Sequence, residues 1–410
     1  MAIDGVGEVM RRLGAFLVAA VWRSAVAAAT VSAVPGCSYF ASEVPVKAVH
    51  SAPHAGAVVA DAGRYPTTPG PPPGRAGTDS YGRVLEGLRM AEYVVVPSQV
   101  DPALTRAIPQ NTNTLRTGDE LPDPLDADDK QNFVVGFSTA RSSAADQVLL
   151  NIVLRFTSAA AAADVAQDTA DLHARTAQRA TIPIPRHSAT LAFGSETAQG
   201  AELHSITAHG PYVFLQYARS KQGVRGAVTL VSGTLDLQEP LIDQFVPDDP
   251  SRFADLSTDD TGLLRRTLPL APQDADLPAR GWDLQPRAAL HFQEDSAKAA
   301  PLFAVTGVVA VAAGKSTVYE AADRFGAERL AERLAADRRG DGYRPAAAVS
   351  EVPAARCFGG GRDDDASPRN FYCAGSAGRY AYEIFSSDQV DAHRQVAAQY
   401  RLLTETDQTW

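Results

Sequence analysis

An order of predicted elements that occurs twice is the feature that most constrains how this chain can fold. Residues 147–156 alternate and carry β-branched side chains, which predicts a strand, and the alanine-rich residues 158–178 predict a helix after it. Residues 201–208 and 212–218 predict a hairpin around a Gly-Pro turn, and residues 236–245 predict a closing helix. The first half of the chain is therefore expected to form a strand, helix, strand, strand, helix series.

The second half repeats this series. Strand-like stretches are predicted at 303–312 and 316–319, a helix at 321–336, strands at 371–373 and 379–385, and a last helix at 389–403. The stretches 154–159 and 318–323 match in phase, and so do 210–214 and 377–381. Such a repeat predicts an α+β fold of two similar β-α-β-β-α units, each an antiparallel-rich sheet with helices packed on one face. Two unrelated α+β domains with a similar order are the alternative.

The segments around these units complete the predicted organisation. Residues 84–91 predict a short helix, followed by a strand at 93–96 that Pro97 ends. Trp282 is expected to pack where the two units meet. The predicted parts are a lipoprotein signal peptide at 1–36, a Pro/Gly/Ala-rich tether at 37–80, an N-terminal α+β domain at 81–250, an interdomain connection at 251–286 and a C-terminal α+β domain at 287–410.

The N-terminus predicts export and lipid attachment. Arg11 and Arg12 give a basic start, residues 13–34 are mostly apolar or small, and the segment ends in Val34-Pro35-Gly36-Cys37. Small residues before a cysteine are typical of lipoprotein signal peptides. We therefore expect the Cys37 thiol to carry lipid and to hold the chain at the outer face of the cytoplasmic membrane. A plain secretory signal or a single membrane-spanning helix is the alternative.

The other two cysteines, Cys357 and Cys373, form a natural pair. They close a short loop rich in glycine and aspartate, and an exported chain meets an oxidising compartment, so a disulfide between them is predicted. The chain-entropy model gives such a bond about 3 kcal/mol of stabilisation. A redox role is not expected, because the pair lacks the Cys-X-X-Cys spacing.

Charge and ligand spacing argue against nucleic-acid and metal binding. The formal net charge is −10 and the Lys and Arg residues do not cluster along the chain, so binding to phosphates is not expected. The histidines His204 and His209 fall on opposite faces of a strand or across a turn. The acidic runs at 126–129 and 363–365 lack the glycine and distal glutamate of a calcium loop, so we interpret them as solvated turns.

No stretch predicts a reaction or a cofactor. Gly314-Lys315-Ser316-Thr317 has the context of a phosphate loop, but Val309 occupies the position of the first glycine, so we expect a hairpin turn. Ala374-Gly375-Ser376-Ala377-Gly378 is near a nucleophile elbow, but it begins with alanine and lies between predicted strands. Arg339-Gly340-Asp341 is expected to end a helix. The sequence therefore predicts no catalytic, cofactor-binding or metal-binding residues, and no enzyme.

Several stretches of the chain resemble one family. They are Gly63-Arg64-Tyr65-Pro66-Thr67-Thr68-Pro69, the run from Leu85 to Val95, Val100-Asp101-Pro102-Ala103-Leu104, the paired cysteines and the run from Gln395 to Leu403. In these stretches the chain resembles the uncharacterised lipoproteins of mycobacteria, nocardiae and their relatives, which carry a duplicated domain of unknown function. The resemblance covers most of the chain after the signal peptide and implies a location, not an activity. Pro35 departs from the usual cleavage site of that family.

We therefore expect a non-enzymatic binding module at the outer face of the membrane, which recognises a cell-envelope lipid, glycan or protein between its two similar units. An envelope hydrolase with a spatially assembled site is the first alternative, and an accessory subunit of a membrane complex is the second. Buried carboxylates with strongly shifted pKa values or a Ser/His contact in one cleft would favour the hydrolase. A broad exposed apolar patch would favour the accessory subunit.

Overall fold

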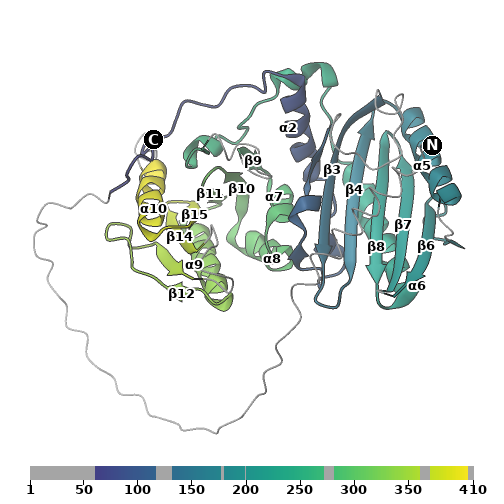
Figure 1. Ribbon diagram of the computed structural model, residues 1–410. Helices are drawn as coiled ribbons and strands as arrows, with labels where there is room; N and C mark the ends of the chain where they lie inside the picture. The colour runs from purple at the N-terminus through teal and green to yellow at the C-terminus, as the bar shows by residue number, and fades with distance from the viewer. Residues whose placement is uncertain are drawn as a thin grey trace, which may run out of the picture. The chain divides into compact units, whose positions relative to one another are not determined.

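The computed structural model describes residues 61–116, 132–176, 180–198, 200–271, 281–360 and 370–404. These residues belong to one compact unit, Ala60–Trp410. The predicted α+β class is confirmed, because the described chain forms two antiparallel sheets with helices packed against them (Figure 1).

The first sheet and its helices come from the first part of the chain. In chain order the elements are α2 (Asp79–Ala91), α3 (Pro97–Val100), β1 (Arg106–Ala107), η1 (Pro109–Asn111), β2 (Asn113–Leu115), β3 (Phe133–Ser142), β4 (Val148–Phe156), α5 (Ala159–Thr176), β5 (Ala180–Thr181), β6 (Leu191–Thr197), β7 (Gly200–His209), β8 (Tyr212–Ser220) and α6 (Gly223–Ile242).

The second sheet and its helices follow. They are η2 (Pro250–Asp255), η3 (Leu264–Arg266), β9 (Trp282–Leu284), α7 (Pro286–Phe292), α8 (Ser296–Thr306), β10 (Val308–Ala313), β11 (Thr317–Ala321), α9 (Arg324–Gly340), β12 (Arg344–Pro345), β13 (Arg356–Gly359), β14 (Phe371–Ala377), β15 (Tyr380–Ser386) and α10 (Gln389–Thr404).

The two sheets have the same strand order. The first runs β1-β3-β4-β8-β7-β6-β5, with β2 also paired to β3, and the second runs β12-β13-β14-β15-β11-β10-β9. Starting from β2, the first sheet runs β2-β3-β4-β8-β7-β6-β5. Starting from β9, the second sheet runs β9-β10-β11-β15-β14-β13-β12, so each strand of one sheet has a counterpart in the other. We therefore define the first repeat as β2 to α6 and the second repeat as β9 to α10, with α7 and α8 inserted between β9 and β10.

Local geometry agrees between the repeats in detail. The β7–β8 and β14–β15 hairpins turn at Gly210 and Gly378, whose positive φ angles lie in the left-handed region that favours glycine. A β-bulge interrupts β3 opposite β4, and another interrupts β10 opposite β11. Ser158 caps α5 and Asp323 caps α9 by accepting a backbone N–H three residues on. The predicted duplication is confirmed.

The hairpins also correct the predicted phase of the repeat by one residue. Phe156 N–H donates to the carbonyl of Pro211 at 2.8 Å, and Ala321 N–H donates to the carbonyl of Arg379 at 2.9 Å. Phe156 therefore corresponds to Ala321, whereas the sequence match placed Phe156 opposite Glu320.

Each repeat places its two long helices on opposite faces of its sheet, whereas the sequence predicted helices on one face. On one face of the first sheet, His204 contacts His173 of α5 and also Tyr217 of β8. Phe214 and Ala218 of β8 lie on the opposite face and cluster with side chains of α6. In the second repeat α9 and α10 divide the two faces of β15 in the same way. The physical reason is that central strands such as β4 are buried along their whole length and need cover on both faces.

Three predicted elements are wrong in type or extent. Residues 93–96 are not a strand, and Pro97 begins α3 because its fixed φ suits the first helical position. The stretch 303–312 is divided into the end of α8 and the strand β10, with Gly307 as a left-handed helix cap between them. The helix α6 begins at Gly223, well before residue 236, because its apolar face packs on the first sheet despite weak local helix propensity.

Residues 61–65, which we call the strap, lie against α10. The Tyr65 hydroxyl donates to Asp391 at 2.7 Å, and the Arg394 guanidinium donates to Asp61 at 2.8 Å. Further along, residues 76 and 77 donate backbone hydrogen bonds to the η2 segment, and the Thr78 side chain caps α2. This part of the segment predicted as a tether is therefore attached to α10 of the second repeat and to the η2 segment and α2.

Candidate binding site at the junction of the repeats

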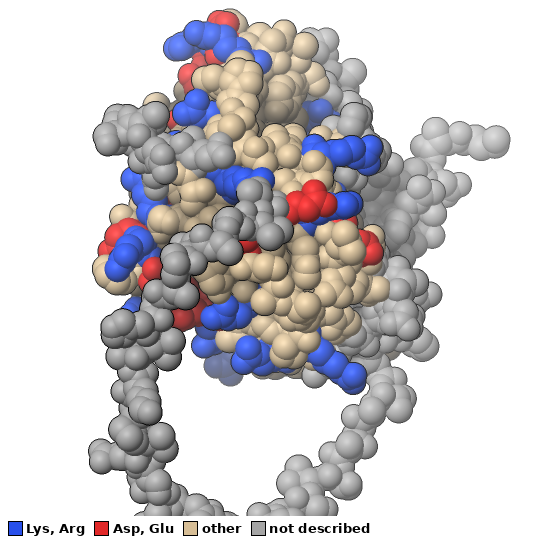
Figure 2. All heavy atoms as spheres, turned by 90° about the vertical axis from the view of Figure 1, so that its left-hand side faces the viewer, with Lys and Arg blue, Asp and Glu red and all other residues tan. Residues whose placement is uncertain are grey.

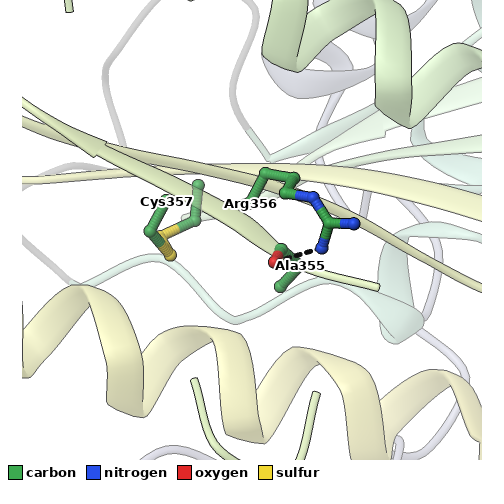
Figure 3. The surroundings of a disulfide bond; sticks show 4 residues. Ala355, Arg356 and Cys357 are labelled. Carbon is green, nitrogen blue, oxygen red and sulfur yellow. Dashed lines mark hydrogen bonds between the residues drawn. A yellow bond between two sulfur atoms is a disulfide. The ribbon is translucent and has the colours of Figure 1, made fainter. Parts of the chain in front are cut away.

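The two cysteines predicted as a pair lie directly opposite each other on β13 and β14. The structure joins Cys357 and Cys373 by a disulfide, with their Cα atoms 4.1 Å apart. Figure 3 shows this bond beside Arg356, whose guanidinium donates to the carbonyl of Ala355. Cys37 and the acidic runs at 126–129 and 363–365 lie outside the described residues.

The other motifs from the sequence have structural roles. Gly314 lies in the turn between β10 and β11, as predicted, and a Cβ there would lie 2.3 Å from the Thr267 hydroxyl oxygen, so only glycine fits. Ser376 lies inside β14, opposite Ala381. Asp341 caps the end of α9, which confirms the predicted helix stop at 339–341.

The two histidines do not come together. His204 packs between His173 and Tyr217 on the α5 side of the first sheet, whereas His209 lies on the other face and forms a 2.7 Å contact with Asp243. Across the described ranges, no group of three His, Cys, Asp or Glu side chains has the arrangement of a metal site. The same part of the chain holds no helix both long and apolar enough to span a membrane.

A buried carboxylate on α2, Glu86, is fully engaged by its neighbours. Glu86 accepts from Arg155 at 2.8 Å, from Arg89 at 2.7 Å and from the backbone N–H of Asp248 at 2.9 Å. Burial raises the pKa of Glu86, and the charge of Arg89 opposes this effect. These contacts tie α2 to β4 and to the segment after α6.

A second buried carboxylate, Glu383, lies between two tyrosines in the second repeat. It accepts from the Tyr319 hydroxyl at 2.6 Å and from the Tyr372 hydroxyl at 3.2 Å. Arg338 lies 4.9 Å from the centre of the Tyr372 ring. Burial is the main cause that raises the pKa of both tyrosines. Neither this group nor Glu86 lines the groove at the junction, so we assign both to the stability of the fold.

The inserted helix α7 is held at both ends by side chains of the first half. At its N-terminal end the Glu92 carboxylate accepts from the Ala288 N–H at 2.7 Å, and burial raises the pKa of Glu92. At its C-terminal end Arg141, which is fully buried on β3, donates to the carbonyls of Leu290, His291, Gln293 and Glu294 at 2.6 to 3.2 Å. A carboxylate at the first turn and a cation at the last turn both suit the helix dipole.

Two pKa shifts mark how deeply this junction is buried. Loss of hydration lowers the pKa of Arg141 to about 10, and it lowers the pKa of His291 to about 3. His291 forms a 3.0 Å hydrogen bond with the carbonyl of Ala91, and its ring packs edge-on against Phe137. The imidazole is therefore neutral in the folded protein, and α7 is fixed relative to the first sheet.

A groove of about 230 Å³ lies beside this fixed helix. Its lining consists of Val95, Gln99, Leu237, Pro240, Leu241 and Gln244 from the first half and Arg287 from α7. The apolar floor includes Leu237, which is 42% exposed, and Arg287 is half-buried and close enough to Glu92 for its charge to lower the pKa of that carboxyl. An apolar floor with one cation and two amide side chains suits a ligand that has a small apolar part and a negative charge.

One wall of the groove is fixed by an unusual side-chain contact. The Gln238 amide accepts from the Val95 N–H at 2.9 Å and donates to the carbonyl of Tyr93 at 2.9 Å. Asn151 donates to the same Gln238 oxygen at 2.9 Å. The side chain of Gln238 therefore satisfies the backbone groups of Tyr93 and Val95, which lie in the turn after α2 and belong to no sheet.

Sequence reasoning did not identify the residues of this groove. Leu237 lies between Asp236 and Gln238 on a predicted helix, and a single exposed leucine on a helix does not indicate a binding site. Arg287 follows a proline at a helix start, and no pattern distinguishes it from a surface arginine. On the face that Figure 2 shows, Lys and Arg side chains lie interspersed with Asp and Glu, so the distribution of charge does not indicate a binding site on that face.

Comparisons with known proteins identify the two halves. Residues 73–258 match the family model described as the N-terminal domain of unknown function DUF7373, and residues 263–406 match its C-terminal counterpart. No curated protein matches the chain. Among solved structures, the extracellular domain of PknH from Mycobacterium tuberculosis is similar at 14% identity and a TM-score of 0.29, over 37% of this chain and 94% of that one.

These matches confirm the expected pair of domains of unknown function. That the chain is a lipoprotein, and that it is related to proteins of mycobacteria and nocardiae, stay predictions.

Proposed function

The chain belongs to the DUF7373 family, whose function is unknown, and on that premise we propose that it is a non-enzymatic binding module of the cell envelope. The observation that carries this proposal is the groove between α6 and α7, where the apolar side chain of Leu237 and the cation of Arg287 are both left open. Apolar surface left exposed in a concave site beside a cation is typical of a ligand-binding site.

The surroundings of the groove support a binding role. The first wall is fixed by Gln238, and the helix that provides Arg287 is held by Glu92 and Arg141. A site whose walls are fixed before the ligand arrives loses little conformational entropy on binding. The buried carboxylates Glu86 and Glu383 lie outside the groove, which supports binding over hydrolysis there.

We place this module outside the cytoplasm, attached to the membrane by lipid on Cys37. The apolar segment before Cys37 and the cysteine pair that forms a disulfide support this location. The strap that begins at residue 61 would join the folded part to the anchor.

The proposal is tested on the full chain, expressed in its own host and purified from membranes in mild detergent. We compare the wild type with Leu237→Arg, which places a long charged side chain over the groove, and with Phe325→Arg, which changes a 63% exposed side chain on α9. Mass spectrometry identifies each molecule that is bound to the wild type and to Phe325→Arg but lost from Leu237→Arg. Such a molecule must then rebind to the purified wild type. If all three proteins retain the same molecules, the groove is not the binding site.

A further inference from the structure

The second repeat contains a close counterpart of the Gln238 contact. The Gln399 amide accepts from the Leu268 N–H at 3.2 Å and donates to the carbonyl of Arg266 at 2.8 Å. Ser316, at the position of Asn151, hydrogen-bonds the same Gln399 oxygen. Each repeat therefore uses a buried glutamine of its last helix to bind the backbone of the segment that precedes the repeat.

This contact aligns the groove residues of the two repeats. Val95 corresponds to Leu268, because each donates its N–H to the glutamine. Counted from the glutamines, Leu237 corresponds to Ala398 and Leu241 to Leu402. Both Ala398 and Leu402 are fully buried, whereas Leu237 is 42% exposed. The same groove is thus covered in the second repeat and open in the first.

The strap is what covers the groove of the second repeat. Ala62 forms one buried cluster with Leu268, Ala398 and Leu402, and Tyr65 packs against this cluster. The backbone of the strap approaches α10 closely at Gly63, because a Cβ added to this residue would overlap the side chain of Arg394. The φ angle of Gly63 is also positive, which favours glycine. The strap turns here, since the Tyr65 N–H donates to the carbonyl of Ala62 at 3.1 Å, so a peptide turn that presents a small apolar side chain is the natural occupant of this groove.

Charge adds a second feature to the occupant. In the second repeat, Asp61 precedes Ala62 and pairs with Arg394 of α10. In the first repeat, Gly233 takes the position of Arg394, where a Cβ would lie 3.1 Å from Val100 of α3, so the helix offers no cation there. The cation of the open groove is Arg287 instead.

We infer that the open groove of the first repeat binds a turn-forming peptide segment of a partner protein, which presents a small apolar residue beside an acidic one. This inference rests on the proposed function, since it names the class of ligand for the same groove. The mode is peptide recognition in a preformed groove, in which the apolar side chain gives most of the affinity and the acid sets the register.

The test uses the full chain in detergent and a fluorescent peptide that copies residues 60–67, Ala-Asp-Ala-Gly-Arg-Tyr-Pro-Thr. Fluorescence anisotropy gives its affinity for the wild type, for Leu237→Asp and for the matched variant Phe325→Asp. We expect Leu237→Asp to weaken binding at least about tenfold, because it removes the apolar floor, and Phe325→Asp to leave it unchanged. Melting temperatures of the variants show that each is folded, and Leu237→Gln replaces Leu237→Asp if that variant does not fold.

A double-mutant cycle tests the acidic residue. The peptide with Asp61→Asn should bind the wild type several-fold more weakly, on the order of threefold to fivefold for a partly exposed ion pair. The same change should have no effect on the Arg287→Gln protein, because the partner charge is then absent. Equal losses in both proteins would show that the acid does not meet Arg287 and would overturn this part of the inference.

Other outcomes separate this inference from the proposed function. No binding at millimolar peptide, or equal binding to Leu237→Asp, overturns the peptide inference. If the wild type binds decanoate but not the peptide, and Leu237→Asp abolishes decanoate binding, the peptide inference is overturned but the proposed binding function stands. A dimer in light scattering that Leu237→Asp dissociates would assign the groove to a second copy and would likewise overturn it.

Discussion

Replacement of Arg141 by alanine is the most informative test of how the two halves are joined. The buried guanidinium donates to five carbonyls, four of them at the end of α7 and one at Thr105. A helix end leaves its last carbonyls without intrahelical partners, although that of Leu290 also accepts from the Gln293 N–H at 3.3 Å. Each carbonyl left unsatisfied in the interior costs about 1 to 3 kcal/mol. Because water can enter part of the space, we expect a net loss of roughly 3 to 5 kcal/mol, as for other broken buried charge contacts.

The expected change in melting temperature follows from the size of the unit. The entropy of unfolding is about 2.1 cal/mol/K per residue, so a unit the length of Ala60–Trp410 has roughly 0.7 kcal/mol/K. The Arg141→Ala variant should therefore melt about 4 to 7 °C below the wild type in scanning calorimetry. Arg141→Lys keeps the charge but not the forked geometry and should fall between the two.

Hydrogen exchange locates the effect. In Arg141→Ala the amides of α7 and α8 should exchange faster, while those of β14 and β15 stay protected. The control is Arg175→Ala on the exposed surface of α5, which should shift the melting temperature by less than about 1 °C. A melting temperature of Arg141→Ala equal to that of this control, or faster exchange spread evenly over both sheets, would refute the reasoning.

Three further predictions test separate parts of the structure. Burial lowers the pKa of His291 to about 3, so between about pH 6.5 and pH 3 the unfolded chain binds a proton at His291 and the folded chain does not. The unfolding free energy is therefore highest above pH 6.5 and falls by about 1.4 kcal/mol for each pH unit below it. Denaturant titrations at pH 7 and pH 5 should show about 2 kcal/mol less pH dependence in His291→Gln than in the wild type. Gln238→Leu and Gln399→Leu should each cost about 2 kcal/mol in unfolding free energy, because each leaves a buried N–H and carbonyl without a partner, and a large effect in only one repeat would contradict the equivalence. Cys37→Ser should move the protein from the detergent phase to the aqueous phase with an unchanged melting temperature, whereas unchanged partition would reject lipid attachment.

Local patterns along the chain predicted much of the fold correctly. The hairpin at Gly210, the cap at Ser158 and the helix α10 are set by residues a few positions apart, and turn and cap chemistry identifies such elements. The order of elements was enough to predict the duplication. The phase of the match was wrong by one residue, because only the backbone register at the hairpins fixes it.

Elements with mixed local signals were predicted less well. The helix α8 contains Pro301 and is apolar on most sides, and without a clear period its sequence resembles a buried strand. The strand β3 was not predicted at all, although every residue but its last is buried, because a strand covered on both faces lacks alternation. Packing against neighbouring elements decides such cases.

The sequence alone determined the class of the fold, its duplication and the expectation of a cysteine pair, since these follow from periodicity, repeat order and composition. Only the tertiary structure decided that the halves form one unit and that one groove is covered while its counterpart is open. Arg141 binds carbonyls 149 to 153 positions further along the chain, and the strap reaches α10 across more than 300 positions. Contacts of this kind depend on where packing places distant residues, and no pattern of nearby residues can specify them.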